Sequence, residues 1–103
     1  MTNKTGRRNR KQTQAELTYF ARRAHAAATE EPEGSAAWLL LKAVEGKARR
    51  MVHPSKVELG FVNGFLKRLG EKQVSVPTSG RSELDDRLLD YEAGRLPSDV
   101  FKL

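Results

Sequence analysis

Hydrophobic residues recur at helical spacing in three stretches of the chain. The first stretch predicts a helix over residues 13–29. Thr13 and Glu16 fit a capping box at its start, and a break at Pro32 follows its end. The alanine content also favours this helix, because alanine is the best helix former. The predicted apolar stripe contains Leu17, Phe20, Ala21, Ala24 and Ala28.

The second stretch predicts a helix over residues 35–52. Its apolar stripe contains Trp38, Leu41, Val44, Ala48, Met51 and Val52. His53 ends the helix, because a residue before a proline avoids the helical region. A third helix is expected to begin at once, since Ser55 and Glu58 fit another capping box.

The third helix is expected to end at Gly70, a residue type that tolerates the left-handed conformation of a helix terminus. Its apolar face contains Val57, Phe61, Val62, Phe65, Leu66 and Leu69. Residues 73–81 are interpreted as a loop, in which the alternation of Val74 and Val76 indicates one short strand.

A fourth, shorter helix is predicted over residues 82–93. Ser82 is its expected N-cap, acidic residues occupy its first turn, and Gly94 is expected to cap its end. Leu84, Leu88 and Tyr91 form its apolar stripe.

These elements predict an all-α fold with a three-helix bundle core and a shorter fourth helix. A disordered basic N-terminal arm and a mobile C-terminal segment are expected to flank it. The expected organisation is an arm at 1–11, a helical core at 12–72, a loop at 73–81 and an acidic helix with an apolar tail at 82–103. The length of 103 residues suits a single domain.

Composition excludes several classes of function. The absence of cysteine excludes disulfides, thiolate zinc sites and cysteine nucleophiles. The longest apolar run, residues 36–41, is too short to span a bilayer. No apolar segment of a secretory signal follows the basic N-terminus. We therefore expect a cytoplasmic protein that does not bind a membrane.

Positive charge is concentrated toward the N-terminus. Residues 1–30 contain seven basic and two acidic side chains, whereas residues 77–103 contain four and six. Each of the three main helices also carries a basic pair, and their packing is expected to bring these pairs to one surface. Lysine and arginine side chains at such a surface bind phosphates. The expected nucleic-acid-binding residues are Lys4, Arg7, Arg8, Arg10, Lys11, Arg22, Arg23, Arg49, Arg50, Lys56, Lys67 and Arg68.

This pattern predicts a small accessory or regulatory protein that binds DNA or RNA, mainly through the phosphate backbone. The junction at Pro54 also fits a helix-turn-helix, in which the helix after it would be the recognition helix. The exposed candidates on that helix are Ser55, Lys56, Asn63 and Lys67.

Residues capable of catalysis are few. His25 and His53 lie outside any metal-ligand spacing and are interpreted as ordinary helix residues. Asp86 and Asp90 share a helix face, which suits solvation and helix-start electrostatics. No phosphate loop, nucleophile elbow or dinucleotide motif occurs. We therefore expect no enzyme, no catalytic residue, no metal and no cofactor.

The alternative function is a protein-binding adaptor or inhibitor. Its expected partner-binding residues are Leu84, Leu88, Tyr91, Val100, Phe101 and Leu103. A third possibility combines the two, as a nucleoprotein subunit that binds nucleic acid through its arm and a neighbour, including a copy of itself, through its C-terminal part. A short, basic, helical chain is also typical of accessory proteins encoded by phages and plasmids.

Overall fold

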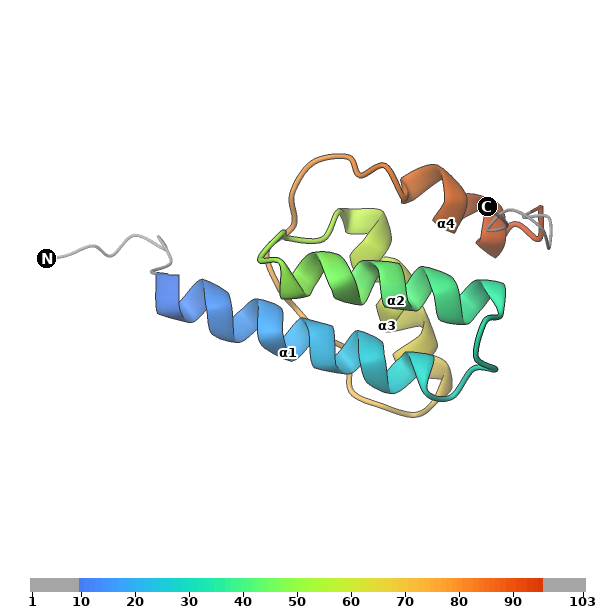
Figure 1. Cartoon of the computed structure of the whole chain (residues 1–103), viewed down its shortest axis with the longest axis horizontal. Coiled ribbons are helices and arrows are strands. Elements are labelled where there is room, and N and C mark those ends of the chain that lie inside the picture. Colours follow the sequence, from blue (N-terminus) through green and yellow to red (C-terminus); the bar gives the residue numbers. More distant parts are fainter. Residues whose placement is uncertain (1–9, 96–103) are drawn as a thin grey trace, which may run out of the picture.

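The computed structural model describes residues 10–95, and within them the regular structure is entirely helical (Figure 1). The helices are α1 (Arg10–Ala28), α2 (Ala36–Arg49), α3 (Lys56–Arg68) and α4 (Asp85–Glu92). The all-α class and the shorter fourth helix, both predicted from the sequence, are confirmed. The predicted arm lies mostly, and the predicted apolar tail wholly, outside the described residues.

The arrangement is centred on α1 and α2, which lie side by side and run in opposite directions (Figure 1). α3 packs on α1, and α4 packs on α3 and α2. The small residues Ala21, Ala24 and Ala28 are fully buried on α1, which allows α2 to approach it closely. The core of the bundle therefore lies between α1, α2 and α3, and α4 covers one side of it.

Helix α1 begins three residues earlier than its sequence predicts. Thr13 lies inside the helix rather than at its cap, and Arg10 and Lys11 belong to the first turn. Lysine, arginine and glutamine are good helix formers, so nothing in this segment stops the helix at Thr13. Two cations expected in the flexible arm are instead held on a rigid element.

Helices α2, α3 and α4 end in the same backbone motif. After α2, the Val52 amide donates to the Lys47 carbonyl (3.1 Å) and the Met51 amide donates to the Ala48 carbonyl (2.9 Å). This pair of bonds defines a Schellman motif, and Met51 occupies its left-handed position with a φ of 65°. The sequence prediction that Met51 and Val52 lie on the buried stripe is therefore wrong, and both are exposed.

The equivalent positions after α3 and α4 are glycines, as predicted. Gly70 and Gly94 have φ values of 75° and 74°. Such conformations are easy for glycine because it has no Cβ. The ends of α3 and α4 could therefore be predicted from the sequence, whereas the end of α2, where a methionine takes the left-handed position, could not.

An aromatic cluster joins α3 to α4. The rings of Phe61 and Phe65 meet edge to face with centroids 5.1 Å apart, and Tyr91 packs edge to face on Phe61 at 5.7 Å. Leu84 and Leu88 are buried in the same core. Burial of these apolar side chains is what attaches α4 to the bundle.

The segment between α3 and α4 forms no strand within the described residues, contrary to the sequence prediction. The Asn63 side chain takes the place of a neighbouring strand. Its Nδ2 donates to the Val74 carbonyl (2.9 Å), and its Oδ1 accepts from the Val74 amide (2.7 Å). Val74 itself is buried. One side chain of α3 thus anchors the segment to the bundle.

A buried polar network joins α2, α3 and the start of α4. Lys47 on α2 contacts Glu58 on α3 (Nζ to Oε2, 3.0 Å) and donates to the Ser82 hydroxyl (2.9 Å). Glu58 also accepts from the Ser55 amide and completes the predicted capping box. The Ser55 hydroxyl donates to Asp85 (2.6 Å). Because Glu58 is fully buried, this network satisfies a charge that would otherwise destabilise the core.

Ser82 differs from its predicted role as the N-cap of the fourth helix. Leu84 occupies the cap position, and α4 begins at Asp85. The Ser82 hydroxyl nevertheless accepts from the Leu84 amide (3.0 Å), and Asp85 accepts from the Ser82 amide (3.1 Å). Ser82 therefore starts a turn that leads into the helix.

Candidate nucleic-acid interface

Most of the predicted nucleic-acid-binding residues that the structure describes are exposed. Within residues 10–95 several of them have no ion-pair partner, namely Arg10, Lys11, Arg22, Arg50, Lys56, Lys67 and Arg68. Lys4, Arg7 and Arg8 lie outside the described residues. Apart from Arg68, whose guanidinium lies 4.5 Å from the centre of the Phe65 ring, these cations can contact phosphates without first giving up an intramolecular partner.

Two predicted cations are instead used inside the molecule. Arg23 pairs with Glu71 (Nη2 to Oε1, 3.0 Å) and holds the start of the α3–α4 connection against α1. Arg49 pairs with Glu45 one turn earlier on α2 (Nε to Oε2, 2.7 Å). These contacts make Arg23 and Arg49 weaker candidates than their neighbours Arg22 and Arg50.

The basic pairs on α2 and α3 do not converge on one surface, contrary to the sequence prediction. Met51 follows the basic pair Arg49 and Arg50 of α2. It lines a pocket together with Arg10 and Gln14 at the start of α1. Leu69 follows the basic pair Lys67 and Arg68 of α3. It lines a different pocket with Ala26 near the end of α1. α2 and α3 end beside opposite ends of α1 (Figure 1), so their basic pairs lie in different regions of the molecule.

Cations without an ion-pair partner among the described residues lie along α1 from Arg10 to Arg22 and at the end of α2, which lies beside the start of α1. We call this region the α1 basic surface and define it by Arg10, Lys11, Arg22 and Arg50. Arg50 approaches Gly46, where an added Cβ would lie 3.4 Å from its Nη1. At this distance a Cβ would make an ordinary van der Waals contact, so the Arg50 side chain lies back along α2 without depending on the glycine.

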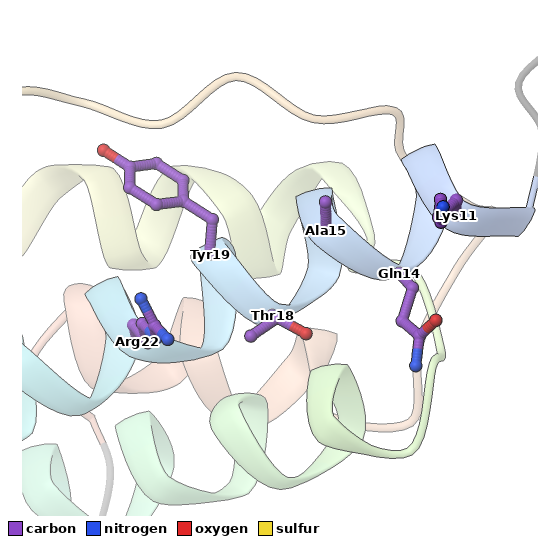
Figure 2. A pocket seen from close by; sticks show the side chains of 6 residues that line it. All are labelled: Lys11, Gln14, Ala15, Thr18, Tyr19 and Arg22. Atoms are coloured by element: carbon purple, nitrogen blue, oxygen red, sulfur yellow. The ribbon is translucent and has the colours of Figure 1, made fainter.

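A shallow groove runs along the exposed side of α1 within this surface. It has a volume of about 440 Å³ and is lined by Lys11, Gln14, Ala15, Thr18, Tyr19 and Arg22. Figure 2 shows these side chains, with the Tyr19 ring extending away from the helix. We call it the Tyr19 groove. A second pocket of about 430 Å³ lies beside it, and Gln14 lines both.

Tyr19 is a candidate that the sequence reasoning missed. Its side chain is 47% exposed, although it lies between the buried residues Leu17 and Phe20. The available signal was its position off the predicted apolar stripe, four residues after Ala15 and three before Arg22. An aromatic ring between basic residues on one helix face is a pattern found in nucleic-acid-binding surfaces.

Two of the four side chains predicted to be exposed on a recognition helix are used by the fold instead. Ser55 is 2% exposed and hydrogen-bonded to Asp85, and Asn63 is engaged with Val74. Lys56 and Lys67 remain exposed, at opposite ends of α3. Reading of base edges by α3 would require free polar side chains, whereas Ser55 and Asn63 already form hydrogen bonds within the protein.

Glu45 forms a second charged cluster on α2. Its carboxylate contacts Lys42 (2.7 Å) and Arg49 (2.7 Å), and His25 of α1 lies 3.4 Å away. Burial raises the pKa of Glu45, but the hydrogen bonds from Lys42 and Arg49 outweigh it and leave the pKa below its ordinary value. The cluster links α1 to α2 and keeps Glu45 ionised.

The acidic residues of α4 do not gather into a site. Asp85 faces Ser55, while Asp86 pairs with Arg81 (3.0 Å) and Asp90 with Arg95 (2.8 Å). In the described part of the chain, no group of three or more potential metal-ligating side chains occurs.

The predicted partner-binding residues of α4 belong mainly to the chain's own core. Leu84 and Leu88 are buried, and Tyr91 packs on Phe61. Leu89 is the exposed apolar residue of this helix, at 48%. The remaining predicted anchors, Val100, Phe101 and Leu103, lie outside the described residues.

None of the helices in residues 10–95 combines the length and the apolar character that a membrane crossing requires. No known protein family, curated protein or solved structure matches this chain.

Proposed function

We propose that this chain is a small accessory protein that binds nucleic acid, mainly through the phosphate backbone. The observation that carries the proposal is the α1 basic surface, whose cations are exposed and have no ion-pair partner within residues 10–95. Residues 1–9 precede this surface directly in the chain and add Lys4, Arg7 and Arg8. Residues 1–15 contain no acidic side chain, so this segment and the first turn of α1 together supply a run of positive charge.

The physical basis is the release of counterions. Each lysine or arginine that neutralises a phosphate frees condensed cations, which favours binding at low salt. The net charge of +6 also attracts a polyanion over long range. The cations of the α1 basic surface do not have to leave a carboxylate first, so their full charge is available to phosphates.

The test measures the affinity of the protein for three labelled 20-nucleotide probes: single-stranded DNA, duplex DNA and RNA. Fluorescence anisotropy reports the binding at a series of salt concentrations. We expect binding at low salt that weakens linearly on a plot of log affinity against log salt. The double variant Lys11→Gln/Arg22→Gln should make this plot less steep, with the magnitude of its slope reduced by about 1.5. Absence of binding to all three probes at low salt would refute the proposal.

The matched control is Lys67→Gln/Arg68→Gln, which removes the same charge from the end of α3, outside the α1 basic surface. Its slope should stay closer to that of the unmodified protein. If the two double variants weaken binding equally, net charge rather than the α1 basic surface controls affinity. Deletion of residues 1–9 measures the contribution of the segment before α1.

The alternative, a protein-binding adaptor or inhibitor, has less support. Its proposed anchors Leu84 and Leu88 contribute to the stability of the bundle, so they are not available to a partner while α4 is packed. Leu89 alone offers an exposed apolar side chain on that helix.

A further inference from the structure

Tyr19 is placed where a flat ligand can reach it. The side chain is about half exposed, and within residues 10–95 its hydroxyl makes no hydrogen bond. Ala15, one turn earlier in the Tyr19 groove, has a small side chain, and Thr18 points away from the ring (Figure 2). The exposed ring therefore neither completes the core nor satisfies a polar group of the fold.

The groove also has the charge of a phosphate-binding surface. Lys11 and Arg22 lie toward its two ends, separated by eleven residues or about 16 Å of helix. Both are exposed, and neither has an ion-pair partner among the described residues. A ligand that fits the groove should therefore carry negative charges on both sides of a flat, weakly polar group.

A nucleotide strand with an unstacked base has this chemistry. We propose that the Tyr19 groove binds single-stranded nucleic acid, with one base stacked on the Tyr19 ring and flanking phosphates held by Lys11 and Arg22. A duplex keeps its bases stacked inside and offers the ring only its outer surface, so single strands should bind more tightly. This inference rests on the proposed function and adds the class of nucleic acid to it.

The decisive variant is Tyr19→Ala, which keeps a good helix former at an exposed position. We expect it to weaken binding of a 20-nucleotide single strand by about 5- to 150-fold, the range for loss of one stacked base. Duplex affinity and the salt slope should stay unchanged, because no charge is lost. Tyr19→Phe should bind like the unmodified protein, since stacking needs the ring and not the hydroxyl.

Leu89→Ala is the matched control, because it removes an equally exposed apolar side chain from the acidic α4. It should leave single-strand affinity unchanged. Circular dichroism melting of each variant checks that the fold is intact. A second measurement is photo-cross-linking to a single strand containing 5-iodouracil, which should map by mass spectrometry to the peptide containing Tyr19.

The outcomes separate this inference from the proposed function. If the unmodified protein binds nucleic acid but Tyr19→Ala binds single strands equally well, the stacking site is refuted and the backbone-binding function stands. Preference for duplex over single strands would also overturn the inference. If no nucleic acid binds at low salt, both fail, and an acidic protein becomes the occupant to test.

Discussion

At the scale of single residues, the fold depends on charged side chains that are held in particular contacts. Glu45 is the clearest case, because its carboxylate is buried and meets two cations of its own helix. The surrounding charges hold its pKa below the ordinary value of 4.5. A depressed pKa means that the folded state binds a proton less readily than the unfolded state.

This predicts a pH-dependent effect of Glu45→Gln. The stabilisation from Glu45 is present above its unfolded pKa and is lost as the pH falls through the lower folded pKa. We expect the substitution to reduce the free energy of unfolding by about 1 to 2 kcal/mol at pH 7. The difference from the unmodified protein should shrink as the pH falls below about 4.5.

Urea denaturation at a series of pH values measures this difference. Gln14→Ala, on the exposed face of α1, controls for a general effect of the buffer. A loss of stability that is the same at pH 7 and at pH 3 would contradict the assigned role of the charge.

At the scale of elements, the connection between α3 and α4 is held by side chains rather than by regular structure. The Asn63 amide satisfies both backbone groups of Val74, which a strand would otherwise pair. The Ser79 amide also donates to the Pro54 carbonyl (2.8 Å). These contacts let an irregular segment cross the surface of the bundle in a fixed position.

We predict that Asn63→Ala loosens this segment. Loss of the two hydrogen bonds should destabilise the protein by about 2 kcal/mol, since both Val74 groups would then need other partners. Hydrogen exchange at the Val74 amide should accelerate more than exchange in α2. Gln73→Ala, at the exposed neighbouring position, should change neither quantity. Unchanged protection of Val74 in Asn63→Ala would show that the segment is held by packing alone.

At the scale of the whole molecule, the network around Lys47 and Glu58 sets how α2, α3 and α4 are joined. The Glu58 side chain is fully buried, and that of Lys47 is 12% exposed. Removing one member of a buried ion pair leaves the other charge uncompensated, which costs about 3–5 kcal/mol. We therefore expect Lys47→Met to be strongly destabilising, as measured by urea denaturation.

Two further variants make this test specific. Lys42→Met removes a more exposed lysine whose partner Glu45 keeps a second cation, so its cost should be below about 1 kcal/mol. Glu58→Gln in the Lys47→Met background should restore part of the stability, because the buried charge is then gone. If the double variant is no more stable than Lys47→Met, the loss comes from packing and not from charge.

The sequence alone determined several features that depend on a few neighbouring residues. Three such features were predicted: the helical periodicity, the capping box of Ser55 and Glu58, and the helix ends at Gly70 and Gly94. The start of α1 at Arg10 was not predicted, because no side chain between Arg10 and Thr13 is a strong start or stop signal.

Only the tertiary structure decided which side chains of the candidate site lie together. The sequence supplied the cations, but the directions of α2 and α3 place their basic pairs beside opposite ends of α1. Exposure of Tyr19 and use of Asn63 as a backbone partner likewise depend on which faces other elements cover. Such choices follow from packing between distant residues, and a pattern of neighbouring residues does not contain them.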